Sequence, residues 1–281
     1  MVARMTIKEA SRKRLLLSLL VLTAALVLLT SFGFSRIPTI KNGGQPLGSE
    51  EVKFLAAVLL ILIIFMFTFV LALSAAFVAS PAISGDVESG IALAMLTRPI
   101  SRLDLVAGKW LGLTAMVTIY VVTACGLEFF LVWLGTGYQP PYPLQFMAYM
   151  IGEAVVVLTA SLLLSTRLSA MTGGVIALGL YGLAWIGGIA SAIGLAFHND
   201  AIANAGTVSK LLIPTDGLWH GAIFSLEPAV MLTAADAASA TRGGNPFFSP
   251  SGPPLSYDLW VCFWIVGVLA LAAWSFQHRE V

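Results

Sequence analysis

The sequence predicts an all-α, polytopic membrane protein with six transmembrane helices. Hydrophobic residues make up 58% of the 281 residues and charged residues only 10%, whereas roughly 25% of residues are charged in an average soluble domain. The mean hydropathy of +0.93 points the same way. A soluble domain of this size could not bury so much apolar surface, so we expect the surrounding solvent to be lipid.

Six apolar segments are long enough to cross a bilayer. A hydrocarbon core about 30 Å thick requires about 20 apolar residues at the helical rise of about 1.5 Å per residue. The predicted spans are residues 15–34, 54–79, 105–134, 144–165, 170–197 and 259–276. Together they predict a single transmembrane domain over residues 1–281.

Basic residues concentrate on one side of these spans, which predicts the orientation. With the N-terminus in the cytoplasm, that side carries Arg4, Lys8, Arg12, Lys13, Arg14, Arg98, Arg102, Lys109, Arg167 and Arg279. The other side carries Arg36, Lys41, Lys53, Lys210 and Arg242. We therefore expect a protein of the cytoplasmic membrane with both termini in the cytoplasm. Residues 1–14 are interpreted either as a helix on the inner membrane surface or as a plain basic anchor.

A cytoplasmic segment over residues 80–104 connects the second and third spans. It contains Gly-Asp-Val-Glu-Ser-Gly at 85–90, an apolar run at 91–96 and Thr-Arg-Pro-Ile-Ser-Arg at 97–102. Acids before a short apolar run, with a proline and arginines after it, are typical of a helix that begins and ends abruptly. We expect this helix to dock a partner; the alternative is a solvated loop.

The connection over residues 198–258 lies outside the cytoplasm in this orientation. About 60 residues without regular structure would be unusual in a compact protein. Apolar stretches at 211–213 and 218–226 and a helical composition at 229–240 predict short re-entrant or interfacial helices. This connection is also a candidate docking surface for an extracytoplasmic partner.

Sequence motifs for enzymatic chemistry, metals or cofactors are absent. No His-Glu-x-x-His or Cys-x-x-Cys pattern occurs, and both cysteines lie in apolar runs. Gly85 and Gly90 have the spacing of a phosphate-binding loop, but Ile91 and Ala92 stand where that loop needs its lysine and hydroxyl. The net charge of +1 argues against nucleic acid as a partner. We expect no catalytic residue, no metal and no cofactor bound by this chain.

Two carboxylates fall inside predicted spans, where a charge costs at least about 2.5 kcal/mol. Glu153 lies nine residues into the fourth span, close to the expected midplane. Glu128 is expected nearer the outer interface, where it can reach water. For each residue two interpretations stay open: a place on a substrate or proton pathway, and a structural hydrogen bond between helices.

The fifth span is rich in glycine, and Ala184, Gly188 and Ala192 recur on one helical face. Small residues at this spacing allow another helix to approach closely. Tight packing is one interpretation of this face, and a flexible hinge is the other.

The residues between the second and third spans resemble the signature of ABC-2 type exporter permeases. That signature has two acids, a glycine and a threonine, then an apolar stretch, then proline, serine, arginine and glycine-lysine. The matching positions here are Asp86, Glu88, Gly90, Ile91, Pro99, Ser101, Arg102, Gly108 and Lys109. Asp86 replaces the usual glutamate and Ile91 the usual threonine. A weaker resemblance lies at residues 212–221, and the six spans extend the likeness over nearly the whole chain.

The resemblance implies a type V exporter permease that exports a substrate using ATP hydrolysed by a separate subunit. Its implied partners are two ATP-binding cassette ATPase subunits, which would bind ATP and magnesium, a second copy of itself or a sibling permease, and lipids. The helix between the second and third spans would contact the ATPase as a coupling helix, and the second and fifth spans would line the path. The implied coupling residues are Asp86, Glu88, Ser89, Gly90, Arg98, Pro99 and Arg102, with both arginines anchoring the helix exit by hydrogen bonds or to lipid phosphates.

Two other functions stay open. A proton-coupled secondary transporter would use Glu153 and Glu128, although the sequence lacks the inverted repeats common in such proteins. A non-transporting scaffold would instead convey ATPase motion to an outer partner at residues 198–258.

Overall fold

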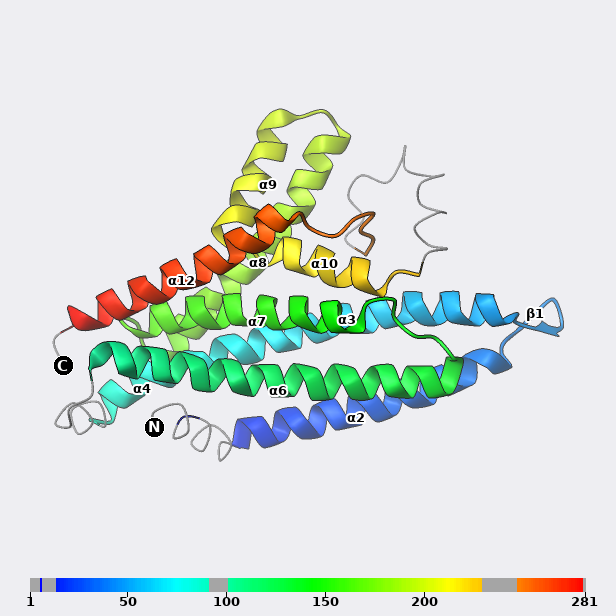
Figure 1. Ribbon diagram of the computed structural model, residues 1–281, viewed down its shortest axis with the longest axis horizontal. Helices are drawn as coiled ribbons and strands as arrows, with labels where there is room; N and C mark the ends of the chain where they lie inside the picture. The colour runs from blue at the N-terminus through cyan, green and yellow to red at the C-terminus, as the bar shows by residue number, and fades with distance from the viewer. Residues whose placement is uncertain (1–5, 7–13, 91–100, 229–246, 280–281) are drawn as a thin grey trace.

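In the computed structural model, which describes residues 6, 14–90, 101–228 and 247–279, the chain forms a bundle of long helices (Figure 1). Six of these helices are long and apolar enough to cross a membrane, and they correspond to the six predicted spans. They are α2 (Arg14–Arg36), α3 (Ser49–Ala79), α6 (Arg102–Thr136), α7 (Pro143–Ser165), α8 (Ala170–Ala196) and α12 (Leu255–Gln277). The all-α prediction is confirmed. Among the described residues the only strands are β1 (Lys41–Asn42) and β2 (Gln45–Pro46), which follow the 3-10 helix η1 (Ile37–Thr39).

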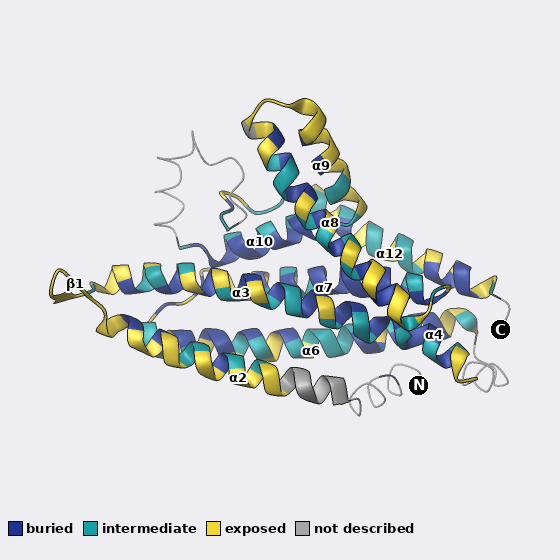
Figure 2. Cartoon of the chain, turned by 180° about the vertical axis from the view of Figure 1, so that it is seen from behind, coloured by how far each residue is buried: buried dark blue, intermediate teal, exposed yellow. Residues whose placement is uncertain are grey.

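Helix α7 forms the centre of the bundle. It packs against α3, α6, α8 and α12, and against the short helix α10 (Asp216–Leu226). Residues 153–162 of α7 are all buried. Helix α2, by contrast, packs mainly on α6 and exposes apolar side chains such as Leu28 and Leu29 (Figure 2). Such an outward apolar surface suits a helix that faces lipid.

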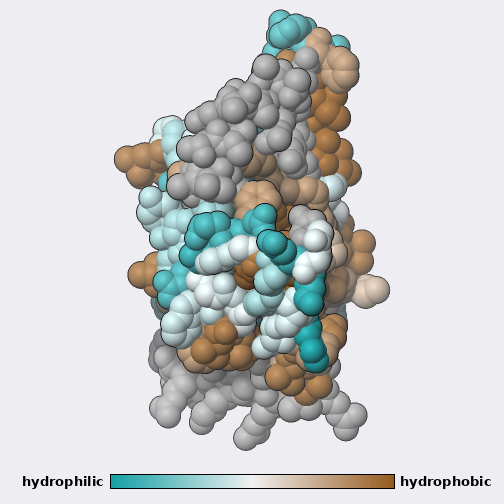
Figure 3. Space-filling view, turned by 90° about the vertical axis from the view of Figure 1, so that its right-hand side faces the viewer, coloured by the Kyte–Doolittle hydropathy of each residue, from teal (hydrophilic) through white to brown (hydrophobic). Residues whose placement is uncertain are grey.

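The two ends of the bundle differ in character. One end, here named the α4 end, contains the short helix α4 (Pro81–Glu88), the start of α6 and the end of α12 (Figure 1). The opposite end, the hairpin end, contains β1 and β2. Figure 3 looks onto the hairpin end and shows hydrophilic and neutral residues across its centre, with apolar residues along its sides. Residues 1–14, where the sequence predicts an interfacial helix, lie outside the described residues apart from Thr6 and Arg14.

Helices α8 and α9 (Asp200–Leu212) form a closely packed hairpin that projects from the bundle (Figures 1 and 2). Glycines make this approach possible. A Cβ atom at Gly194 would overlap the backbone of Ala203, and one at Gly206 would overlap the backbone of Gly187 and Ser191. Glycines of the fifth span therefore allow close packing, at Gly187 and Gly194. On the predicted face of Ala184, Gly188 and Ala192, Gly188 lies against the Asp216 side chain of α10.

Replacing Gly206 by alanine should force α9 away from α8. We expect Gly206→Ala to lower the stability of the protein by about 1–3 kcal/mol, as overpacking does. The control is Gly179→Ala, because no heavy atom lies within 4 Å of a Cβ built there. Thermal unfolding of both variants in detergent, followed by loss of the monodisperse species, would measure this. Equal melting temperatures for the two variants would contradict the packing role.

Candidate functional site

Helix α4 carries the first half of the predicted coupling segment. Pro81 lies in its first turn, where a missing backbone N–H is tolerated. The chain leaves α4 through Gly90, whose φ of 73° lies in the left-handed region that favours glycine. The two acids of the predicted coupling segment, Asp86 and Glu88, therefore lie within α4. The apolar run at 91–96, for which the sequence predicts a helix, lies outside the described residues.

The first turns of α4 and its C-terminal end differ in exposure. Ala82, Ile83 and Ser84 are buried against the bundle. Glu88, Ser89 and Gly90, at the far end of the helix, are exposed. Three of the predicted coupling residues are therefore accessible to a partner at the α4 end.

Asp86 is placed differently from what the sequence suggested. Its side chain lies on the buried face of α4 and forms an ion pair with Lys109 of α6. The two side chains are only 8% and 4% exposed, so both charges are removed from water. A charge buried in this way is unfavourable unless it is paired, so each residue requires the other. The pair thus ties α4 to α6, and Asp86 is not part of the exposed surface.

Arginines at the α4 end hold the last turn of α12. The Nη1 of Arg102 donates to the backbone oxygens of Phe276, Gln277 and Arg279 at 2.9, 3.0 and 2.7 Å. Arg167, which follows α7, donates to the hydroxyl and the backbone oxygen of Ser275, both at 3.0 Å. Positive charge is favourable here because the carbonyls at a helix C-terminus carry the negative end of its dipole. Arg102 thus holds the end of α12, and its expected role at the exit of the coupling helix stays a prediction; Arg98 and Pro99 lie outside the described residues.

The start of α6 is also fixed to α7. The indole Nε1 of Trp110 donates to the Thr159 hydroxyl at 2.9 Å. Trp110 directly follows Lys109, and Arg102 lies two helical turns earlier. One short stretch of α6 therefore contacts α4, α7 and α12.

Glu153 joins three spans at the centre of the bundle. Its side chain is 3% exposed, and the Thr68 hydroxyl of α3 donates to its Oε1 at 2.8 Å. The Tyr181 hydroxyl of α8 lies 3.0 Å from the Thr68 oxygen. Among the described residues, Oε2 has no hydrogen-bond partner. The structural hydrogen bond is present, and a pathway role for Glu153 stays a prediction.

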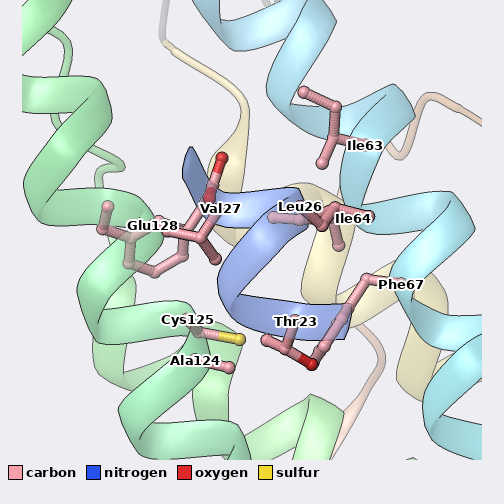
Figure 4. Close-up of a pocket in the computed structure, with 10 residues that line it drawn as sticks. Thr23, Leu26, Val27, Ile63, Ile64, Phe67, Ala124, Cys125 and Glu128 are labelled. Atoms are coloured by element: carbon pink, nitrogen blue, oxygen red, sulfur yellow. The ribbon is translucent and has the colours of Figure 1, made fainter. Parts of the chain in front are cut away.

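Glu128 does not reach water, contrary to the expectation from the sequence. It is 7% exposed, and Thr30 of α2 donates to its Oε2 at 3.0 Å. The reason is that α2 covers this face of α6. Glu128 lines a small crevice between α2, α3 and α6 together with Thr23, Cys125 and seven apolar residues (Figure 4). The cavity of about 30 Å³ is comparable to one or two water molecules. The hydrogen bond between Thr30 and Glu128 joins α2 to α6, and a pathway role for Glu128 stays a prediction.

A further buried charge, which the sequence reasoning missed, lies where α9 leads into α10. The Oδ2 of Asp216 lies 3.3 Å from Nζ of Lys210 and 3.8 Å from Nε2 of His220. Burial lowers the pKa of His220, so we take Lys210 as the charged partner. The Asp216 carboxylate also lies against Gly188 of α8, where a Cβ would overlap it. The stretch 212–221, which carried the weaker resemblance, is therefore a place where α9, α10 and α8 pack together. In the sequence, the features that could have indicated it are the acid Asp216 and the glycine on α8 that it contacts.

At the hairpin end, Glu227 follows α10 and is 1% exposed. Its Oε1 accepts a hydrogen bond from the Ser249 backbone N–H at 3.1 Å, and Oε2 has no partner among the described residues. Burial raises the pKa of Glu227 to about 7. Tyr138 donates its hydroxyl to the neighbouring Leu226 carbonyl, which holds the loop after α6 against α10.

Residues 2–281 match the family model described as ABC-2 family transporter protein. The chain belongs to this family. No curated protein matches it. The family and the six apolar helices identify a multi-pass membrane permease, a component that lacks its own ATPase. The described part of this ABC-2 permease contains no group of three His, Cys, Asp or Glu side chains that could hold a metal.

Removing one partner of the Asp86–Lys109 pair should strongly destabilise the permease. Asp86→Ala leaves Lys109 buried without a counter-charge, which is expected to reduce stability by about 3–5 kcal/mol. The control is Glu50→Ala, which removes an exposed ion pair with Lys53 and should change stability by less than about 1 kcal/mol. Thermal unfolding in detergent measures both. Similar losses for the two variants would contradict the burial argument.

The buried Glu227 should make the stability of this permease depend on pH. Because its folded pKa of about 7 exceeds the ordinary 4.5, the unfolded chain releases the proton first, and stability falls as pH rises between those values. Below that interval the neutral carboxyl contributes fully, and above it the loss is complete. The melting temperature of Glu227→Gln should fall less across this interval than that of the wild type. Parallel melting curves for the two proteins would contradict the prediction.

Proposed function

We propose that this chain is the transmembrane permease subunit of an ABC exporter, which couples ATP hydrolysis by a separate ATPase to export of a substrate. The observation that carries the proposal is the exposed end of α4. Glu88, Ser89 and Gly90 project from a helix whose other face is tied into the bundle. A partner that pushes on this end would move the spans with it.

The proposed orientation places the α4 end in the cytoplasm. Arg102, Lys109, Arg167 and Arg279 all lie at this end, as the positive-inside rule favours. Both termini then lie on the same side as the ATPase. The hairpin end, with its hydrophilic centre, faces outward (Figure 3).

The proposed assembly contains two ATPase subunits, which bind ATP and magnesium, and a second copy of this chain or a sibling permease. In this assembly the substrate path runs between the two permeases, lined by α3 and α8. Glu153 of α7 lies behind these two helices, hydrogen-bonded to Thr68 of α3, whose hydroxyl also contacts Tyr181 of α8. The segment 198–258 is the proposed docking surface for an outer partner.

Reversing the charge at the exposed end of α4 should separate the permease from its ATPase. Glu88→Arg is expected to reduce co-purification of the ATPase encoded by a neighbouring gene by about tenfold, since each tenfold change corresponds to about 1.4 kcal/mol of contact energy. The matched control is Glu50→Arg, the same change at an exposed acid on the hairpin end. Pull-down from co-expressing cells measures both. Unchanged ATPase binding by Glu88→Arg, or equal losses in both variants, would count against the proposal.

Proton-coupled transport is a second candidate, and one observation favours it. The unpartnered Oε2 of Glu153 is a buried acid at the centre of the bundle, as in many proton-driven transporters. In proteoliposomes without ATP, a pH gradient should then drive a proton flux that Glu153→Gln abolishes and that Glu50→Gln, at an exposed acid, leaves intact. Absence of any proton flux in the wild type would remove this candidate.

A further inference from the structure

The position of the Asp86–Lys109 ion pair indicates a role in addition to packing. It is the most deeply buried of the ion pairs among the described residues. It adds a link to α6 for helix α4, which continues directly from α3 and also packs on α7 and α8. A buried ion pair is a poor way to gain stability, because a well-packed apolar pair of similar volume is usually as good. Its presence therefore calls for another reason.

An ion pair in an apolar setting resists separation in a way that apolar contacts do not. Without water to screen them, the two charges attract over a longer range than dispersion contacts do. Close-packed apolar side chains also transmit displacement, but a gap of about 0.5–1 Å already loses about a quarter to a half of their contact energy. A displacement of α4 would therefore be passed to Lys109 instead of being absorbed at the contact.

The contacts of α6 show where such a displacement would go. Trp110, next to Lys109, is hydrogen-bonded to Thr159 of α7. Arg102, two turns earlier, is bonded to the last carbonyls of α12. Helix α7 in turn contacts α3, α8 and α10. The same stretch of α6 thus reaches the rest of the bundle.

We propose that the Asp86–Lys109 ion pair is the joint that transmits motion of α4 to the transmembrane helices, with both residues acting as positioning residues. This inference rests on the proposed function, because it needs an ATPase to move α4. It differs from that function in assigning the transmission step to one pair inside the permease, away from the exposed Glu88–Gly90 contact.

The test compares two double variants of the full complex. Asp86→Asn with Lys109→Met removes both charges and keeps similar volumes, so packing is preserved. Asp86→Lys with Lys109→Asp reverses the pair and keeps the attraction. Thermal unfolding of each complex shows first that both variants are folded.

The readout is hydrogen exchange at the hairpin end, far from the altered pair. The backbone N–H of Tyr142 donates to the Ser225 carbonyl at 3.2 Å and ties the loop before α7 to α10. Exchange of the peptide that contains Tyr142 is measured in nucleotide-free complex and in complex trapped with ATP and vanadate. In the wild type and in the reversed pair, trapping should change this exchange by about tenfold. In the neutral pair the ATPase should still hydrolyse ATP, but trapping should leave the exchange unchanged.

Three outcomes would overturn the inference. A neutral pair that responds like the wild type shows that packing alone is sufficient. A folded reversed pair that stays as unresponsive as the neutral pair shows that the attraction is not what transmits motion. If no ATPase binds the wild-type chain, the proposed function fails first and this inference fails with it.

Discussion

The attraction between Asp86 and Lys109 joins α4 to α6 at the α4 end of this permease. Two charges can stay buried there only because each neutralises the other. Their pairing turns one face of α4 inward and leaves Glu88, Ser89 and Gly90 outside. It also places Lys109 at the point of α6 where the neighbouring side chains reach α7 and α12. The ion pair, the buried face of α4 and its continuity with α3 together attach this helix and leave its tip exposed.

The same constraint explains the polar groups inside the spans. Lipid offers no hydrogen bonds, so a carboxyl group in a span must find its partner on another helix. Glu153 accepts from Thr68, and Glu128 accepts from Thr30. Each bond joins helices that are distant in sequence, and for α2 it supplements otherwise sparse packing. The short hydroxyl side chains of threonine suit this purpose because they carry a donor without a charge to bury.

The spans could be predicted from the sequence because length and apolar composition alone define them. The contact of Arg102 with the last carbonyls of α12 could not be predicted, because these groups are more than 170 residues apart in the sequence. The pairing of Asp86 with Lys109 could not be predicted either, because nothing local distinguishes a buried aspartate from a solvated one. Helix α9 was also missed, because it contains no long apolar run, although Asn199 caps its start by accepting from the Ile202 N–H. The close approach of Gly206 to α8 could not be predicted. Such features depend on which helices meet, and that information is not local.

In the proposed function, the end of α4 is the surface on which an ATPase acts. The most direct measurement is site-specific photocrosslinking in cells that express the complete complex, with a photoreactive amino acid at Ser89 or at Gln139. Both positions are exposed. Ser89 directly follows α4, and Gln139 follows the end of α6, at the opposite end of the bundle. We predict a crosslink between Ser89 and the ATPase and none from Gln139. A crosslink from Gln139 alone, or none from Ser89 in a complex that still contains the ATPase, would contradict the account.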